Sequence, residues 1–202
     1  YKTTDPYIAA EGQISGSAED LSAQGTANCY IVSKAGAYKI RLCKGNTDAA
    51  LDGVTSVRVL WESFGTDVSP RPGQLISRTC KDGDHAVFEV SSPYTEGNAV
   101  IAAYDSEDRI LWSWHIWLTD QPSEQEYNNN AGTMMDRNLG ATSATPGDVG
   151  ALGLLYQWGR KDPFLGSSSI SESIDAVSTG TWATASDGSQ SLVESNPMIF
   201  YG

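Results

Sequence analysis

The chain has 202 residues, of which 40% are apolar and 19% charged, and it contains 20 glycines. That length allows one large β domain or two of ordinary size, and this composition is typical of a folded, turn-rich β protein rather than a helical or disordered one. The chain has 13 basic and 25 acidic residues, so its net charge is −12. Because this charge repels a polyanion, nucleic acid is excluded as an expected partner. No apolar run of about 18 residues and no basic amphipathic helix occurs, so the sequence predicts neither a membrane span nor a membrane-surface helix.

Residues 1–20 are small, polar and glycine-containing, which favours a leader or a loosely held edge strand. No charged region followed by an apolar stretch precedes the fold, so we expect any export signal to have been removed. The three cysteines, Cys29, Cys43 and Cys80, are odd in number and show no CxxC spacing. We therefore expect free thiols and no metal site, with a single disulfide as the alternative.

From Asn28 the pattern becomes that of short strands separated by turns. The segment CYIVS and the alternating runs at 38–43 and 57–62 predict three strands, and the breaker SPRPG follows at 69–73. The segments LISRTC and HAVFEV flank Lys81-Asp-Gly-Asp84, where Asp-Gly favours a tight hairpin turn.

Residues 98–120, NAVIAAYDSEDRILWSWHIWLTD, predict a second hairpin whose turn is 105–108. Val100, Ala102 and Tyr104 alternate on one face of its first arm. One face of the second arm is expected to hold Ile110, Trp112, Trp114, Ile116 and Leu118. Trp112 and Trp114, together with Trp61, are core candidates because alternation places them on a common buried side. About seven strands over ~100 residues have the spacing of an immunoglobulin-like β-sandwich, which we assign to residues 21–121.

The polar, proline- and asparagine-rich segment 122–131 is predicted to be a linker, followed by a second domain at 132–202. Within this domain we expect one short strand in GTMMDRNLGA. A short helix is predicted with Asp148 as N-cap, Leu152, Leu155 and Tyr156 on its apolar stripe, and Gly159 as its end. The chain closes with a strand in PMIFYG, which would leave edge groups and two aromatic rings uncovered. We expect downstream sequence to cover it; the alternatives are that it lies against the first domain or that a neighbouring molecule adds a strand there.

Five segments resemble the fimbrillin-like cell-adhesion proteins exported to the surface of gut Gram-negative bacteria. They are NCYIVSKAGAYKI, GNAVIAAYD, ILWSWHIWLTD, GTMMDRNLGATSATPGDVGALGLLYQWGRKDPF and NPMIFYG. In those proteins an Ig-like module precedes a domain of the FISUMP ("major paralogous") type, whose layout is similar to C-type-lectin-like folds. The resemblance implies a mainly β chain: an Ig-like β-sandwich followed by a partial α+β, C-type-lectin-like domain. Because relatives continue past Gly202, it also implies that the second domain is truncated.

No residue pattern predicts catalysis or a cofactor. His85 and His115 are far apart and lack a serine or cysteine elbow, and His115 is expected to be a partly exposed strand residue beside Ser113 and Trp117. The acidic turns 82–84 and 105–108 suggest solvated hairpin turns, with a Ca²⁺ site as the alternative.

Tyr156, Trp158 and Trp182 are candidates for an aromatic platform that stacks on sugar rings, and burial in the core is the competing interpretation.

The expected function is that of a non-enzymatic, exported surface protein acting in cell adhesion or as a pilus- or fimbria-associated subunit. Its expected location is the cell surface, bound to the outer membrane as a surface lipoprotein, or the secreted fraction. Its expected partners are other surface or pilus subunits, or a glycan or protein receptor. The alternative is a glycan-binding accessory protein of a surface polysaccharide-uptake system, which exposed aromatic side chains would favour.

Overall fold

Strands dominate the described part of the chain, which confirms the expected mainly β class. The computed structural model describes residues 2–7, 14, 16–66, 68, 70–165, 183–186 and 188–201, with the backbone alone for 2–7 and 183–184. Among these residues no helix has the length and apolar character needed to cross a membrane.

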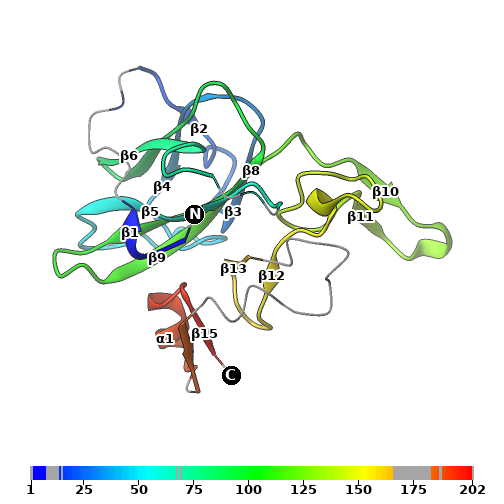
Figure 1. Cartoon of the computed structure of the whole chain (residues 1–202). Coiled ribbons are helices and arrows are strands. Elements are labelled where there is room, and N and C mark those ends of the chain that lie inside the picture. The colour runs from blue at the N-terminus through cyan, green and yellow to red at the C-terminus, as the bar shows by residue number, and fades with distance from the viewer. Residues whose placement is uncertain are drawn as a thin grey trace.

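Two sheets face each other and form the larger part of the molecule (Figure 1). The five-stranded sheet contains, in spatial order, β1 (Lys2–Tyr7), β5 (Ser56–Ser63), β8 (Gly97–Tyr104), β9 (Ile110–Leu118) and β3 (Cys29–Val32). The four-stranded sheet contains β2 (Glu19–Asp20), β4 (Gly36–Arg41), β7 (His85–Val90) and β6 (Ile76–Asp82). Neighbouring strands are antiparallel except for the pairs β3–β9 and β2–β4, which are parallel.

Both predicted hairpins are confirmed. β8 and β9 pair through Ile101 opposite Trp114, and their turn is closed by the bond from the Asp105 amide to the Arg109 carbonyl. β6 and β7 are joined at Gly83, whose φ of 57° is the left-handed conformation that glycine adopts easily. Trp112 and Trp114 are buried between the two sheets, as predicted.

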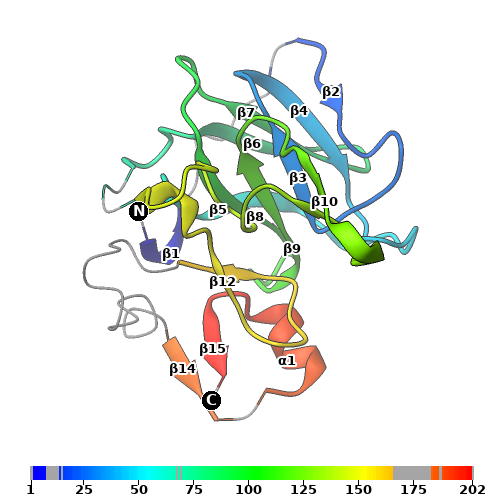
Figure 2. The same ribbon diagram turned by 90° about the vertical axis from the view of Figure 1, so that its right-hand side faces the viewer.

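The outer face of the five-stranded sheet is also covered. A second hydrophobic cluster joins this face to Leu154 and Phe164 of the C-terminal segment, and its sheet residues are Leu60, Trp61, Val100, Ala102 and Tyr104. Figures 1 and 2 place α1, β12 and β15 on the side of β9 that lies away from β4. The five-stranded sheet is therefore buried on both faces.

The prediction that Trp61 shares a face with Trp112 and Trp114 is wrong. The register between β5 and β8 shifts between Val59 and Trp61, so Leu60 is an extra residue and the alternation changes phase there. Trp61 is buried, but in the outer cluster. A second irregularity beside Tyr104 likewise moves Ile110 to the outer cluster, away from Trp112.

Short elements make up the rest of the chain. They are β10 (Glu124–Glu126), the 3₁₀ turns at Asn128–Asn130 and Val149–Ala151, β11 (Thr133–Met135), β12 (Leu155–Tyr156), β13 (Pro163–Phe164), β14 (Ala183–Ala185), α1 (Gln190–Ser195) and β15 (Ile199–Tyr201). β10 and β11 form a hairpin that stands away from the two sheets (Figure 1). The strands predicted in 132–141 and at the C-terminal end are confirmed as β11 and β15, and β10 forms within the segment 122–131. The prediction that the final strand is left uncovered is wrong, because β15 pairs with β14 and Phe200 packs against Phe164 of the outer cluster.

The helix predicted after Asp148 is wrong. Asp148 does cap a turn, accepting a bond from the Gly150 amide, but only the 3₁₀ turn Val149–Ala151 follows it. Glycines at 147, 150 and 153 make a helix costly here, and Gly153 has a φ of 73°. Beyond Gly153 the chain is extended, and it forms the β12–β13 hairpin against the outer face of the sheet.

Candidate functional site

Trp158 lies at the tip of the β12–β13 hairpin and is the most exposed large hydrophobic residue of the described chain. Its exposed fraction is 99%. The tip is a tight turn in which the Arg160 amide bonds to the Gln157 carbonyl at 3.1 Å. Gly159 follows Trp158 with a φ of 77°, a conformation that a residue with a side chain adopts only with strain. The turn therefore holds the indole away from the protein surface.

Arg160 fixes this tip to the C-terminal strand. Its side chain is only 4% exposed, and it donates to the side-chain oxygen of Gln157 at 2.9 Å and to the carbonyls of Asn196 and Ile199. The side-chain amide of Gln157 in turn donates to the carbonyl of Tyr201 and accepts from its backbone N–H. Burial lowers the pKa of Arg160, while the nearby carboxylate of Asp162 opposes this change. The turn that contains Trp158 is thus held to the C-terminal segment by hydrogen bonds from Gln157 and Arg160.

A cleft of about 430 Å³ opens beside the indole. We call it the Trp158 cleft, and its described lining residues are Gln157, Trp158, Gly159, Arg160, Gly188, Gln190, Val193 and Tyr201. It lies between the hairpin tip, α1 and β15. Its volume falls within the ~300–1,000 Å³ range of small-molecule sites, and Trp158, whose ring is exposed, is among its lining residues.

The other two members of the predicted platform are placed differently. Tyr156 is half-buried and packs against the outer cluster, with its hydroxyl 3.5 Å from Nδ1 of His115. Burial raises the pKa of this hydroxyl. Trp182 lies outside the described residues. Among the predicted platform residues with a described position, only Trp158 lines the cleft.

His115 is buried, so the prediction of a partly exposed histidine is wrong: its exposed fraction is 2%. It does lie on the face of β9 with Ser113 and Trp117, but the C-terminal segment covers that face. Nε2 lies 2.9 Å from Oδ1 of Asn98, and the amide of Asn98 donates to the Gly140 carbonyl. This arrangement assigns the proton to Nε2, which leaves Nδ1 as an acceptor for the Cys29 thiol at 3.2 Å.

The Cys29–His115 pair is electrically neutral at ordinary pH. Burial lowers the pKa of His115 to about 3 and raises that of Cys29 to about 12. A nucleophilic cysteine needs a thiolate, which nearby positive charge normally stabilises. The contact was not foreseen because it joins residues 86 positions apart. Its chemistry is that of a structural contact across the parallel β3–β9 pair.

A second buried cluster of hydrogen bonds joins the residues just before β13 to β9. The Lys161 ammonium donates to the Ser113 hydroxyl at 2.7 Å and to the Asp162 carboxylate at 2.6 Å, and Ser113 donates to the same carboxylate. Burial lowers the pKa of Lys161. Because Ser113 and Asp162 are buried, this cluster locks two strands together. Farther along the chain, Arg137 pairs with Asp136 at 2.8 Å.

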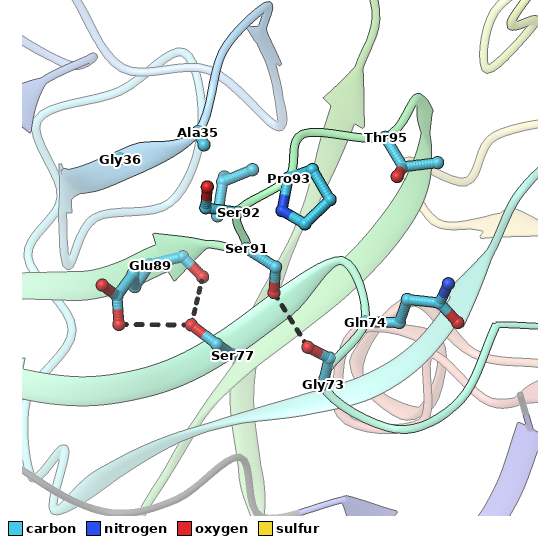
Figure 3. Close-up of a pocket in the computed structure, with 11 residues that line it drawn as sticks. Ala35, Gly36, Gly73, Gln74, Ser77, Glu89, Ser91, Ser92, Pro93 and Thr95 are labelled. Atoms are coloured by element: carbon cyan, nitrogen blue, oxygen red, sulfur yellow. Dashed lines mark hydrogen bonds between the residues drawn. The ribbon is translucent and has the colours of Figure 1, made fainter.

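A larger cavity of about 760 Å³ lies at the end of β6 and β7 (Figure 3). Its polar groups largely bond to one another: Ser77 donates to the carboxylate and carbonyl of Glu89, and Ser91 donates to the Gly73 carbonyl. No aromatic residue is among its described lining residues. It is therefore less suited than the Trp158 cleft to hold a ring-shaped ligand.

The carboxylates of Asp105 and Asp84, in the two acidic turns, bond to neighbouring residues of the same turns. Asp105 accepts from the amides of Glu107 and Arg109 and from the Arg109 guanidinium, which lowers its pKa. In the other turn Asp84 pairs with His85. Within the described ranges, no three histidine, cysteine, aspartate or glutamate side chains are grouped to hold a metal ion. All three cysteines are free, as predicted.

Comparison with protein-family models, with curated proteins and with solved structures finds no match. The function must therefore be inferred from the geometry of the site and from the resemblance noted in the sequence.

Proposed function

We propose that the chain is part of an exported, non-catalytic bacterial surface protein of the fimbrillin-like type, and that it acts in cell adhesion by binding glycans at the Trp158 cleft. It would work at the cell surface, bound to the outer membrane or secreted, with host or bacterial glycans as receptors. An Ig-like module would carry a partial lectin-like domain of the FISUMP type.

The strand order supports the Ig-like part of this proposal. The orders β2-β4-β7-β6 and β5-β8-β9 correspond to the ABED and CFG sheets of the constant-type immunoglobulin arrangement, although β2 runs parallel to β4 where those sheets are antiparallel. The free cysteines depart from antibody domains, in which a disulfide joins the two sheets. The lectin-like part is supported by the resemblance alone.

One observation carries the glycan-binding proposal: a fully exposed indole is held on a tight turn beside a cleft that Trp158 lines. A ring held in the open on a turn with defined hydrogen bonds is free to stack on a ligand, and it lies at a cleft of suitable size. The C–H face of a sugar ring packs well on the electron-rich face of an indole. Gln190 and Tyr201, which also line the cleft, add groups that can bond to hydroxyls.

The direct test is glycan binding by the wild type and by Trp158→Ala, measured by glycan array and calorimetry. We expect the substitution to weaken binding by about 5- to 150-fold, the equivalent of the ~1–3 kcal/mol that one stacking aromatic ring contributes where it holds a nucleic-acid base. The melting temperature should not change because the side chain is exposed. Met134→Ala, which shortens another exposed apolar residue, is the matched control and should bind like the wild type. Equal binding by Trp158→Ala and wild type would contradict the proposal.

The alternative role in polysaccharide uptake would use the same cleft, so cells must distinguish it from adhesion. Cells carrying Trp158→Ala should attach less well to glycan-coated surfaces while growing normally on soluble polysaccharide. Normal attachment with slow growth on the polysaccharide would favour the uptake role.

A second candidate, a subunit of a pilus or other surface assembly, is favoured by the β10–β11 hairpin. Met134 is 61% and Tyr127 53% exposed on this hairpin. An isolated two-stranded ladder is marginally stable in water, so a partner would stabilise it. Glu124 and Glu126 on β10 fit a neighbouring subunit that brings lysine or arginine residues.

The test is to express the double variant Tyr127→Ser, Met134→Ser in the source cells. We expect the variant to be missing from high-molecular-weight surface assemblies that Trp158→Ala still enters. Normal incorporation of the double variant would exclude this role for the hairpin.

A further inference from the structure

The described residues that line the Trp158 cleft include one charged side chain, Arg160, and no carboxylate. A site for an acidic sugar normally offers an accessible arginine or lysine to the carboxylate or sulfate group. A site that holds sugar hydroxyls through Ca²⁺ supplies several carboxylate and carbonyl oxygens. The charge of the ligand therefore depends on whether Arg160 is accessible.

Arg160 is not accessible to a ligand. Only 4% of its side chain is exposed, and its guanidinium donates to Gln157, Asn196 and Ile199 within the protein. The carboxylate of Asp162 lies 3.8 Å away and balances part of its charge. An anionic ligand would have to displace these bonds, which hold the hairpin tip to β15.

The surroundings of the cleft also disfavour an anion. The adjoining smaller cavity of about 210 Å³ is lined by Glu194 and Asp162 as well as by Lys161. Lys161 is paired with Asp162 at 2.6 Å, and Lys44 with Glu194 at 2.8 Å. The charges of these two lysine side chains are therefore already balanced by carboxylates. The net charge of −12 also repels an acidic polymer over longer distances.

The exposed groups that the described residues present to a ligand are neutral. The Trp158 indole is exposed, and Gln190 on α1 is an exposed amide whose nitrogen makes one bond, to Glu194 at 3.2 Å. The amide oxygen of Gln190 accepts no bond from the described residues and can receive one from a hydroxyl. Stacking on an indole and bonding to an amide both suit an uncharged sugar ring.

We infer that the ligand of the Trp158 cleft is an uncharged oligosaccharide, bound without a divalent cation. This inference rests on the proposed glycan-binding function and specifies its ligand class. It also assigns Gln190 as the residue that bonds to sugar hydroxyls, with Arg160 as a positioning residue that holds the turn.

The experiment uses pairs of polysaccharides that share a backbone and differ in charge: dextran with dextran sulfate, and fully methyl-esterified polygalacturonate with polygalacturonate. Binding of the whole chain is measured by calorimetry or surface retention, with and without excess EDTA. We expect Trp158-dependent binding to the neutral member of a pair only, unchanged by EDTA. Gln190→Ala should weaken it by about three- to tenfold, the effect of one lost hydrogen bond. Ser191→Ala on the same helix is the matched control.

The outcomes separate the two levels of the proposal. Trp158-dependent binding that prefers the charged member, or that EDTA abolishes, overturns the uncharged-ligand inference and leaves glycan binding standing. If binding depends on Trp158 but Gln190→Ala has no effect, the assignment of Gln190 is wrong. If neither these pairs nor a glycan array shows any binding that Trp158→Ala reduces, the proposed function itself fails.

Discussion

Acid should destabilise the protein through His115, and the size of this effect follows from its burial. The pKa is lowered from 6.5 to about 3 because the imidazole is enclosed between β9 and the C-terminal segment. Near neutral pH the ring is uncharged in both the folded and the unfolded chain. Below pH 6.5 the unfolded chain binds a proton that the folded chain excludes, so the free energy of unfolding falls by ~1.4 kcal/mol per pH unit until about pH 3.

At about pH 4 this contribution amounts to a loss of about 3 kcal/mol. Urea unfolding followed by tryptophan fluorescence, at about pH 7.5 and about pH 4, measures it when the wild type is compared with His115→Gln. The variant retains an amide able to bond to Asn98 and lacks the titrating ring. Both proteins share all carboxylates, so their contributions cancel in the comparison. We expect the wild type to lose about 3 kcal/mol more than the variant over this pH range. Equal losses in the two proteins would refute the assignment of a buried, neutral imidazole.

Two further substitutions test the core and the site. Trp114→Ala removes an indole that is 1% exposed between the sheets, and we expect a loss of ~3–5 kcal/mol; an unchanged urea midpoint would overturn its place in the core. Arg160→Met removes the bonds that hold the hairpin tip, and hydrogen exchange at the Tyr201 amide should accelerate by about 10- to 100-fold, which corresponds to ~1.5–3 kcal/mol. An unchanged exchange rate would show that Gln157 alone fixes β15.

The hairpins were predictable because their determinants are local. Alternation along β9 and the turn residues 105–108 lie within one short stretch of sequence. The position of Trp61 was not predictable, because a one-residue bulge at Leu60 reverses every later alternation in the strand and leaves no mark in the residue types. The helix predicted after Asp148 does not form, because Gly150 and Gly153 disfavour it even though the apolar residues have helical spacing.

The burial of His115 could have been predicted from the neighbouring strand β8, although the alternation along β9 alone does not indicate it. β8 reads GNAVIAAY, and all of its residues are buried. A strand that is apolar at nearly every position indicates a sheet covered on both faces, which would have placed the opposite face of β9 inside as well. The contact with Cys29 depends on the parallel register of β3 and β9 and could not be read from spacing. The exposure of Trp158 beside a half-buried Tyr156 likewise arises from tertiary packing.

The covered outer face of the five-stranded sheet has a practical consequence for dividing this chain. A fragment that stops near residue 121 would keep β1 through β9 but would lack the C-terminal residues that cover Trp61, Val100 and Trp117, so these side chains would be exposed to solvent. A bare apolar sheet face of that kind promotes aggregation. The change in composition at 122–131 is therefore a poor place to cut for recombinant expression, and a soluble piece should extend at least through Phe164, which closes over that face.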